Sequence, residues 1–461
     1  MDQDENLETK QHQEIHEQEP DLAQLVEHAF DTDAIDEVFA LTTDLHPADM
    51  ADIIQQFPAQ KRLKLIELLH SVIPNEVLPL LEESIREQIL PIFTTEEVAA
   101  AVTELESDDA ALILEDLHED KQREVLDAIP IEERITFEKT LSYPEYSAGR
   151  LMQREVVLCS PQWTLGQLIN SLEDIENLPE HFYNVYVVDD DDKPVGELPL
   201  SSILRHPRRT PVSKVMNTEI KTVPVNLDQE EVAYIFRRYS LSSMPVVEQD
   251  GRIAGMITVD DIINVIEEEA GDDILKLGGV TEESSLYSNI MQASLSRFRW
   301  LFISLINCLI ASAVIAHFEQ ALDKFVVLAF LMPIVASMGG NAGMQTMTVT
   351  VRSLSLYNLR VGHVLAAIKR ELGIAAVNGA ALALILSSIT IAWTRDVKIG
   401  LIIGTALIFN IIWSGFAGAF IPYILHRINL DPAISAGPIM STTTDVVGFS
   451  VFLGLATWVL L

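Results

Sequence analysis

The C-terminal stretch from residue 431 to residue 461 reads DPAISAGPIMSTTTDVVGFSVFLGLATWVLL. After Asp431, Asp445 is the one charged side chain in this stretch, which is long enough to cross a bilayer. A carboxylate near the centre of such a helix costs about 3 kcal/mol, so an acid there normally faces a bundle interior or a water-filled cavity. Asp445 is therefore a candidate for handling ions, although hydroxyl groups of a neighbouring helix would also satisfy it.

Four further uncharged, apolar runs precede this one, at residues 300–318, 325–351, 372–394 and 399–425. Each reaches or exceeds the roughly 18 residues that identify a spanning helix. The basic residues that flank the runs are unevenly distributed, with seven on one side of the membrane and three on the other. Because basic residues favour the cytoplasmic side, the sequence predicts a five-helix α transmembrane bundle with a cytoplasmic N-terminal region and an external C-terminus.

The charge of the chain is divided as unevenly as its hydropathy. Residues 297–461 contain 10 Lys and Arg against 6 Asp and Glu, which leaves 21 basic and 62 acidic residues in the preceding part. Nucleic acid is excluded as a partner, since phosphate binding needs a basic face. Cations are the favoured partners, because charge of one sign at this density repels itself unless counter-ions gather on it, although acidity also serves solubility alone.

The N-terminal end gives information about location. Residues 1–20 are polar and acidic and are predicted to form a disordered tail. They lack the apolar core of a signal peptide, so the N-terminal half is expected in the cytosol. The two cysteines, Cys159 and Cys308, lie in different halves and form no CxxC, so neither a disulfide framework nor a thiolate metal site is indicated.

Residues 21–145 carry apolar side chains at helical spacing, interrupted by prolines, which predicts a series of short helices. The segments 45–54 and 105–114 look like one unit used twice, each with a capping Asp or Ser followed by an apolar helix face. Because stacked helical units form a superhelix, we expect an all-α superhelical N-terminal domain.

A second internal repeat covers residues 146–270. The segments of the first copy (146–207) that return in the second copy (208–270) are 151–156, 187–189 and 196–204, which match 215–220, 245–248 and 255–263. Short β-rich runs alternate with a helix in each copy, and the helix of the second copy is predicted at 229–239. This order resembles a tandem pair of CBS modules, which have an α/β fold.

In the CBS family, a Gly, a Thr and an Asp before the last helix often hold a nucleotide ribose. Gly255, Thr258 and Asp261 match that pattern in the second copy. The first copy departs from it, with Pro199 and Ser202 at the hydroxyl and carboxylate places. The resemblance therefore implies a nucleotide such as ATP in one cleft at most.

Residues 271–296 connect the repeat to the bundle and are expected to include a helix at about 287–295. In the second membrane run, the glycine-rich segment 338–346 is predicted to break the helix. Consecutive glycines with Asn at membrane depth are costly unless they pack tightly or line a polar path, because lipid satisfies no backbone group. Both interpretations stay open, since small residues also allow close helix packing.

On the last run Gly437, Ser441, Asp445 and Gly448 recur at three- to four-residue steps and so share one helix face. If this face lines an axis between two subunits, two Asp445 carboxylates about 8 Å apart repel each other by about 2 kcal/mol at an effective dielectric constant near 20. A divalent cation would relieve that repulsion.

The whole pattern resembles the MgtE family of magnesium channels over nearly the full length of the chain. The match rests on the helical units, the repeat that ends at 258–261, the glycine run 339–343, and Thr442-Thr443-Thr444-Asp445. The resemblance implies a bacterial plasma-membrane homodimer, embedded in the lipid bilayer, that takes up Mg²⁺ through a pore between its transmembrane domains (297–461). Asp445 of both subunits would hold the hydrated ion, and Gly340, Asn341 and Thr444 would line the pore.

The resemblance also implies a cytosolic domain that binds Mg²⁺, compacts, and closes the pore through a plug-like connecting helix at 271–296. The carboxylates that match metal-facing positions of the family, besides Asp445, are Asp431, Asp261, Glu269, Asp272, Asp273 and, more weakly, Asp109. Where the family commonly has acids, the chain has Arg237, Arg238, Ser240 and Asn264. One or more cytosolic Mg²⁺ sites are therefore expected to be missing or replaced by an Arg contact.

Three other functions are consistent with parts of the sequence. A membrane-embedded aspartyl hydrolase would need a second intramembrane acid to share a proton with Asp445, which stands alone in the predicted runs. A CBS-regulated carrier of another solute would need basic or aromatic pore residues. Co²⁺, Mn²⁺ or Ca²⁺ would suit the same oxygen ligands, although Mg²⁺, which keeps several waters, suits a wide pore with few acids best. The prediction is a non-enzymatic Mg²⁺ channel.

Overall fold

The computed structural model describes residues 22–70, 72–174, 178–179, 182–280, 290–356, 361–428 and 430–461. The predicted N-terminal tail lies outside the described residues. The chain divides into two compact units, Met1–Glu267 and Glu268–Leu461, which are described separately below.

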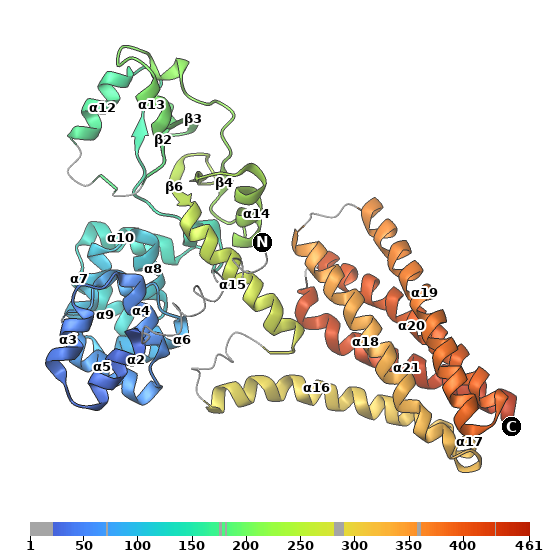
Figure 1. The fold of residues 1–461 in the computed structure, drawn as a ribbon. Helices are drawn as coiled ribbons and strands as arrows, with labels where there is room; N and C mark the ends of the chain where they lie inside the picture. Colours follow the sequence, from blue (N-terminus) through green and yellow to red (C-terminus); the bar gives the residue numbers. More distant parts are fainter. Residues whose placement is uncertain are drawn as a thin grey trace, which may run out of the picture. The chain divides into compact units, whose positions relative to one another are not determined.

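Short helices make up the first part of the first unit, as the proline spacing predicts (Figure 1). They are α2 (Leu22–Asp31), α3 (Ile35–Thr42), α4 (Pro47–Gln56), α5 (Ala59–Leu69), η1 (Asn75–Val77), α6 (Glu83–Ile89), η2 (Leu90–Ile92), α7 (Thr95–Glu104), α8 (Ser107–Glu115), α9 (Glu119–Ala128) and α10 (Ile131–Leu141). Each of these helices buries at least one apolar residue against its neighbours, so the apolar faces meet inside a helical layer.

The predicted helix caps of the repeated unit are wrong. Helix α4 is capped by His46, whose Nδ1 accepts the backbone N–H of Ala48 at 3.2 Å, and Pro47 takes the first helical position. Helix α8 follows Glu106, which makes no side-chain cap. The reason is that the acidic residues of both segments lie inside the first helical turn, where they favourably face the positive end of the helix dipole.

The two predicted CBS modules follow and have matching elements. The first contains α11 (Ala148–Leu151), β1 (Leu158–Cys159), α12 (Leu165–Glu173), β2 (Asn184–Val188), β3 (Pro194–Pro199) and α13 (Leu200–Arg205). The second contains η3 (Val212–Lys214), β4 (Val223–Pro224), α14 (Gln229–Tyr239), β5 (Ser243–Val247), β6 (Ile253–Thr258) and α15 (Val259–Leu277). The helix predicted at 229–239 is confirmed.

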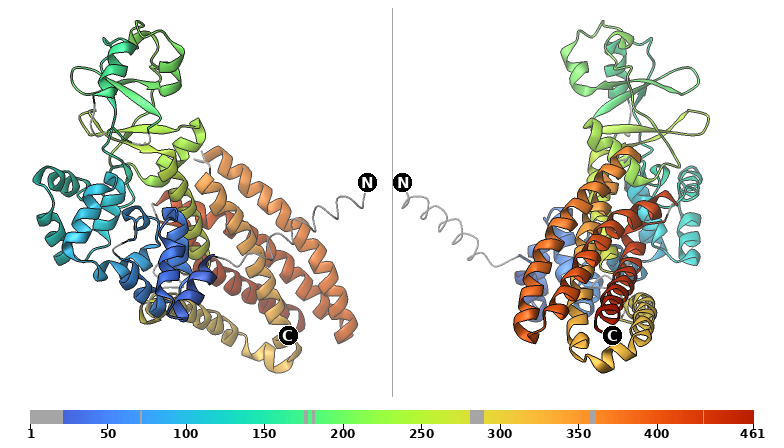
Figure 2. Two further views of the ribbon diagram at one scale, coloured as in Figure 1. Left: turned by 60° about the vertical axis from the view of Figure 1, so that its left-hand side comes forward. Right: turned by 90° about the vertical axis from the view of Figure 1, so that its right-hand side faces the viewer.

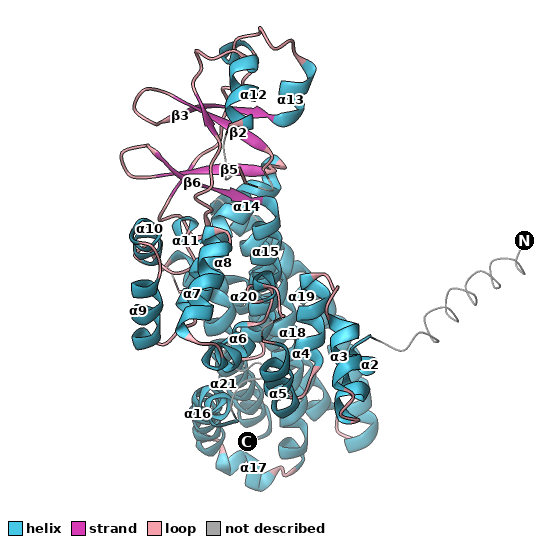
Figure 3. Cartoon of the chain, turned by 90° about the vertical axis from the view of Figure 1, so that its left-hand side faces the viewer, coloured by secondary structure: helices cyan, strands magenta, loops and turns pink. Residues whose placement is uncertain are grey.

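The two sheets have the same topology. In each, the first strand pairs in parallel with the second, and the second pairs antiparallel with the third. The register shifts at the same place in both, between Val187 and Val188 and between Val246 and Val247. Figure 3 shows the sheets close together, with β2 and β3 next to β5 and β6. The internal repeat read from the sequence is therefore a structural repeat.

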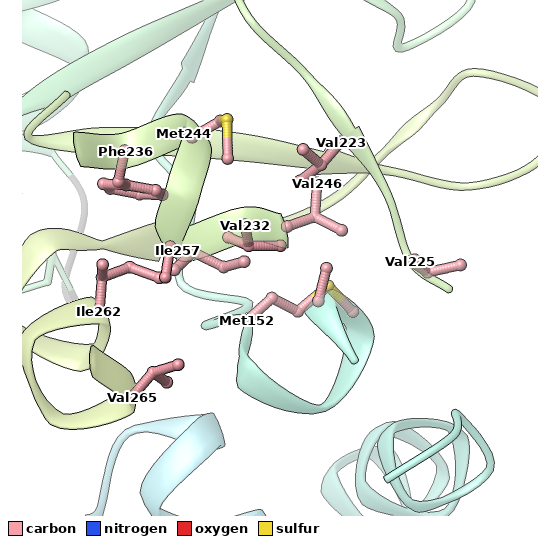
Figure 4. Close-up of a cluster of buried hydrophobic side chains, with 12 residues drawn as sticks. Met152, Val223, Val225, Val232, Phe236, Met244, Val246, Ile257, Ile262 and Val265 are labelled. Carbon is pink, nitrogen blue, oxygen red and sulfur yellow. The ribbon is translucent and has the colours of Figure 1, made fainter. Parts of the chain in front are cut away.

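The equivalent glycines of the two copies have a packing role. A Cβ built on Gly255 would lie 2.4 Å from the backbone oxygen of Gln153, and one on Gly196 would lie 3.0 Å from that of Asn217. Both glycines admit a neighbouring chain segment that forms a β-bridge with the third strand. Met152, which precedes Gln153, enters the core of the second module beside Ile257 (Figure 4). Backbone approach therefore explains Gly255 without a ligand.

Within its described residues, the second unit contains five helices that are long and apolar enough to span a membrane, as predicted. Its elements are α16 (Ile290–His317), α17 (Glu319–Lys324), α18 (Val327–Leu356), α19 (Val361–Thr394), α20 (Val397–Arg427) and α21 (Pro432–Leu460). In both views of Figure 2, α18 to α21, in orange and red, run alongside one another. Helix α20 is the most buried of the five, whereas α16 packs against α21 and is largely exposed.

The predicted break in the second membrane run is wrong, because α18 continues as one helix through its glycines. A Cβ on Gly339 would lie 2.1 Å from Nδ2 of Asn410, and one on Gly343 would lie 1.9 Å from Cε of Met440. The glycines therefore let α18 approach α20 and α21 closely, which was the packing alternative for this segment.

Helix α15 runs without interruption from the second CBS module to Leu277, past the predicted module boundary at residue 270. It ends at Gly278 and Gly279, and Gly279 has a φ of +72°, which favours glycine. Residues 281–289, which include the first three residues of the helix predicted at 287–295, lie outside the described residues. The other six residues of that prediction, 290–295, are helical and form the start of α16.

We expect Gly418→Ala to destabilise the membrane unit and Gly340→Ala, a matched change on α18, to be tolerated. A Cβ on Gly418 would lie 2.7 Å from the backbone oxygen of Gly343, so the two helices would have to separate. Such overpacking costs about 1–3 kcal/mol. A Cβ on Gly340 would have no other part of the described chain within 4 Å, so it would fit without any shift. Thermal unfolding of the purified chain in detergent measures both, and equal midpoints would contradict this account of α18.

Candidate cation sites

Asp445 lies at the middle of α21 and is partly exposed in the single chain. Among the described residues it has no hydrogen-bond or ion-pair partner. Along the predicted face, Gly437 borders open space and Ser441 is exposed, whereas Gly448 packs against the side chain of Asn410. The part of the face from Gly437 to Asp445 is therefore accessible from outside the chain. Among the described residues, no hydroxyl group of a neighbouring helix donates a hydrogen bond to Asp445, which was the alternative interpretation of this acid.

The three predicted pore-lining residues have different surroundings. Asn341 is exposed, and Gly340 has no other part of the described chain within 4 Å of its Cβ position. Thr444 is fully buried, and its hydroxyl donates to the backbone oxygens of Met440 and Ser441 at 3.1 and 3.0 Å. The structure thus places Gly340 and Asn341 on accessible surface and Thr444 in the interior of the chain.

Asp445 is not the one acid in the membrane helices, contrary to the prediction from the sequence. Helix α19 begins at Val361, and its candidate span starts at Val364, so Glu371 lies within the span. Glu371 is 9% exposed and accepts the hydroxyl of Thr346 at 3.4 Å. The adjacent Lys369 and Arg370 had placed it in a predicted cytoplasmic linker. Glu371 and Asp445 are not hydrogen-bonded to each other, so the proton-sharing pair of a hydrolase is not formed among the described residues.

Asp431 and Asp272, both predicted metal-facing residues, meet at a lysine that the sequence analysis missed. Asp431 caps α21: its Oδ1 accepts the N–H of Ala433 at 2.8 Å. Its Oδ2 lies 3.4 Å from Nζ of Lys276, and Oδ2 of Asp272 lies 3.6 Å from the same nitrogen. Leu277 packs into an apolar cluster with Ala433, which anchors the end of α15 to the start of α21. We call these contacts the α15–α21 junction.

Glu269 and Asp273, the other two predicted carboxylates of this helix, lie on α15 and are partly buried. With Asp272 they fall at steps of three and four residues, so the three share one face of the helix. The lysine at position 276 continues that face, and it could have been noticed as a basic residue four positions after Asp272.

Asp109 and Asp261 are brought together in the first unit, along with two acids that the sequence analysis missed, Glu106 and Asp108. Glu106, Asp108 and Asp109 lie at the start of helix α8, and Asp261 lies in the first turn of α15. The hydroxyl of Thr258 donates to Asp261 at 2.7 Å. We call Glu106, Asp108, Asp109 and Asp261 the acidic cluster.

Hydrogen bonds hold the start of α8 against the entry of the first CBS module. Gln153 Nε2 donates to Glu106 at 2.7 Å, and the hydroxyl of Ser107 donates to Glu155 at 2.8 Å. The backbone N–H of Arg154 donates to the same Ser107 oxygen at 2.8 Å. These bonds fix the position of α8, so its carboxylates face Asp261 in a defined arrangement.

The carboxyls of the acidic cluster are poorly solvated and repel one another. Burial, with a smaller contribution from neighbouring carboxylates, raises the pKa of Glu106 to about 7. Burial first and Asp261 second raise the pKa of Asp109 to about 6, and burial raises that of Asp261 to about 6. The pKa of Asp108 is raised well above its usual range by the same causes, and its Oδ1 is buried with no hydrogen-bond partner.

The acidic cluster fits a cation by charge and by its unsatisfied oxygen, but not as a closed cage. Among the described residues, no group of three or more Asp, Glu, His or Cys side chains converges in a way that could hold a metal ion directly. Because Mg²⁺ keeps several waters and often uses only one or two carboxylates, water molecules would have to supply the remaining ligands.

A pocket of about 420 Å³ lies between the two CBS modules. Tyr183 and Asn184 line it from the first copy, together with Pro199 and Ser201, and residues 240–243 line it from the second. Asn184 Nδ2 donates to the hydroxyl of Ser243 at 2.9 Å, which joins the two modules beside the pocket. Both copies therefore line the pocket, with Pro199 and Ser201 on the side of the first copy, whereas the predicted nucleotide residues Gly255, Thr258 and Asp261 are not among its lining residues.

Comparisons with known proteins agree with the resemblance read from the sequence. The family model of MgtE, described as a divalent cation transporter, matches residues 332–455, that of the MgtE intracellular N domain matches 45–146, and that of the CBS domain matches 148–209 and 212–268. These matches together cover the helical domain, both modules and most of the membrane unit.

Relatives with the same arrangement extend over most of the chain. The magnesium transporter MgtE of Bacillus subtilis is 29% identical over 414 residues, 90% of this chain and 92% of the relative. That of Thermus thermophilus is 29% identical over 431 residues, 92% and 95% of the two chains. A crystal structure of the cytosolic domain of the Mg²⁺ channel MgtE in complex with ATP is similar to 53% of this chain and 99% of its own, with a TM-score of 0.48 and 27% identity. The chain belongs to the MgtE family of divalent cation transporters.

Proposed function

We propose that this chain carries Mg²⁺ across the bacterial plasma membrane as a channel for uptake. The observation that carries the proposal is Asp445, an accessible carboxylate in the middle of the last membrane helix that has no partner in the part of the chain that the structure describes. Such a group is retained at a cost of about 3 kcal/mol, which points to a role in an ion pathway. Carboxylate oxygen is the ligand that hard dications prefer, and the names of the relatives favour Mg²⁺ among them.

The transporting form is proposed to be a homodimer in which the α21 helices of two protomers face each other. A single chain offers one carboxylate on an open face, which is an incomplete cation site. A two-fold axis along the face from Gly437 to Asp445 would add the second carboxylate, and the small residues leave room for a hydrated ion. Gly340 and Asn341, on accessible surface of α18, are proposed to line the same path, with Thr444 supporting the helix from behind.

The cytosolic part is proposed to sense Mg²⁺ and to close the pore. The unmatched carboxylates of the acidic cluster supply a physical reason, because bringing them together in the compact state is unfavourable without a counter-cation. Mg²⁺ that binds between them therefore favours the compact state over the open one. Glu269, Asp272, Asp273 and Asp431 are proposed to respond to the ion near the membrane, where helix α15 continues into the second unit.

Orientation follows from the linkers. Arg297, Arg299, Arg352 and Arg427 flank membrane helices at ends that share one side, and this side is proposed to be the cytoplasm. With five spans, the C-terminus then lies outside.

The experiment that tests the function is divalent flux in liposomes that contain only the purified chain. We expect Mg²⁺ to enter down its gradient without an added energy source, and Co²⁺ or Mn²⁺ to enter more slowly. Flux of Mn²⁺ or Co²⁺ without Mg²⁺ flux would assign a different cargo, and no flux of any ion would remove the channel proposal.

A nucleotide such as ATP is proposed to place its nucleoside part in the pocket between the CBS modules. Tyr183 and Leu241 offer apolar contact to a base, and the serines at 240, 242 and 243 offer hydroxyl groups. Among the described residues, Glu197 is the one charged side chain that lines the pocket, so the phosphates would have to extend beyond it. Thr258 donates its hydroxyl to Asp261, which leaves the second copy less suited to a ribose.

Ser201→Trp, an exposed position at the pocket wall, is expected to lower ATP or adenosine affinity at least tenfold by filling the space. Leu204→Trp on the same helix α13 is the matched control, because Leu204 is 86% exposed and does not line the pocket. Isothermal titration of the full chain measures both. If Ser201→Trp binds normally while Thr258→Val does not, the nucleotide belongs to the second copy instead.

A further inference from the structure

We propose that the ammonium group of Lys276 takes the place of a metal cation at the α15–α21 junction. It lies between Asp272 and Asp431 and competes there with Mg²⁺. The inference deepens the proposed Mg²⁺ sensing and rests on it only for the identity of the competing ion. Lys276 then sets the Mg²⁺ concentration at which the ion acts at the junction.

The position of the ammonium group carries the inference. Nζ of Lys276 lies 3.4 Å from Asp431 Oδ2 and 3.6 Å from Asp272 Oδ2, so one positive charge faces two carboxylates from two helices. The side chains of Lys276 and Asp272 are only 19% and 14% exposed, whereas that of Asp431 is 38% exposed, so the shielding applies mainly to the Lys276–Asp272 pair. Charge pairs shielded from solvent to this extent are screened less by salt than surface pairs. The lysine therefore neutralises carboxylates that would otherwise repel each other.

The rest of the junction shows what this neutralisation achieves. Leu277, next to Lys276, packs with Ala433 in the apolar cluster at the base of the membrane unit. Ala433 also donates its N–H to Asp431, which caps α21. Holding Asp431 in place thus holds the first turn of the helix that carries Asp445. Lys276 acts on the ion path only through this helix, as a positioning residue.

Competition follows from the charge of the two carboxylates. Mg²⁺ and the ammonium group both need Asp272 and Asp431, and a site that holds one cation repels the other. With Lys276 in place, the junction is closed without Mg²⁺ and responds weakly to it. Without the lysine, the two carboxylates repel each other until Mg²⁺ binds. The sequence predicts missing or replaced Mg²⁺ sites where Arg237 and Arg238 lie on α14, and the junction is a second place where a basic side chain takes that role.

The test is disulfide trapping of the junction in the full-length protein. Leu277→Cys and Ala433→Cys are introduced into a background with Cys159→Ser and Cys308→Ser, because the two positions share one cluster. In this parent we expect rapid cross-linking in EDTA and less than a twofold change with 10 mM Mg²⁺. Lys276→Met is expected to slow cross-linking at least fivefold in EDTA and to recover the parent rate in Mg²⁺ but not in NaCl of equal ionic strength.

Three variants complete the design. Lys276→Arg is expected to behave as the parent, since it keeps the charge. Lys398→Met, which removes an exposed lysine at the start of α20, is the matched control and is expected to change nothing. Adding Asp272→Asn to Lys276→Met is expected to abolish the recovery by Mg²⁺.

Two outcomes would overturn the proposal. If Lys276→Met cross-links at the parent rate in EDTA, the lysine does not hold the junction. If it is slow and Mg²⁺ does not restore it, the lysine is a tether that no ion replaces. Neither readout requires transport, so a failure of the channel proposal in liposomes is distinguished from a failure at this junction.

Discussion

Asp445→Asn abolishes divalent flux, with an expected loss of at least 100-fold. The substitution keeps the size and most of the polarity of the side chain but removes the charge, and a homodimer would lose both charges that face the dication. Each carboxylate within a few ångströms of a dication contributes several kcal/mol at an effective dielectric constant near 20, and about 1.4 kcal/mol corresponds to a tenfold change. Loss of the unpartnered charge also removes the insertion cost, so folding is expected to be unimpaired.

The measurement is Mg²⁺ flux in liposomes, supported by growth of a Mg²⁺-auxotrophic host that expresses the variant. Asp323→Asn is the matched control, because Asp323 is an exposed acid of the same unit in the short helix α17. We expect it to transport as the unmodified chain does. Rescue of growth and flux at normal rates by Asp445→Asn would show that this carboxylate is not in the ion path.

The architecture could be predicted from the sequence because its signals are local. Uncharged runs of membrane length identified the five spanning helices, and the repeated segments identified the two modules before any contact was known. The prediction was less accurate where a helix continues through residues of unfavourable composition. Helix α18 continues through its glycines because α20 and α21 pack against them, and α19 extends over Lys369, Arg370 and Glu371 into its flank.

The candidate sites were predicted one residue at a time, but not as groups. Asp445 was evident because a charge in an apolar run is visible without a structure. Asp108 was not, because its neighbour Asp261 is more than a hundred residues away and its position at the start of α8 suggested a helix cap. Lys276 was missed for the same reason: its relation to Asp431 depends on the packing of Leu277. The pattern of a single sequence does not show which distant segments contact each other.

The second large effect concerns pH at the acidic cluster: in EDTA, the contact between α8 and the start of α15 weakens as pH rises from 5 to 8. The folded-state pKa values of Asp109 and Asp261 are raised to about 6 and that of Glu106 to about 7, above unfolded values near 4. A carboxyl whose pKa is raised on folding contributes most to stability below its unfolded pKa, and this contribution is lost as pH rises through the folded pKa. Summed over coupled groups, the loss is on the order of a few kcal/mol.

Amide hydrogen exchange of residues 107–115 in the intact protein, corrected for the intrinsic effect of pH, measures this contact. We expect faster exchange at pH 8 than at pH 5 in EDTA, and Mg²⁺ is expected to restore protection at pH 8, because the dication takes over the role of the lost protons. Asp108→Asn is expected to reduce both effects, since it removes a buried charge with an unsatisfied oxygen. Asp120→Asn, an exposed acid on α9, is the matched control.

The two halves of this experiment separate two explanations. If protection falls with pH and Mg²⁺ restores it only when Asp108 is present, protons and Mg²⁺ bind to the same carboxylates, and the compact state is stabilised by whichever cation is available. If exchange is the same at both pH values, the carboxylates are solvated well enough to lose their protons without cost, and the acidic cluster has no reason to require an ion. In that case the sensing role would have to rest on the carboxylates of α15 and α21, at Mg²⁺ concentrations high enough to compete with Lys276.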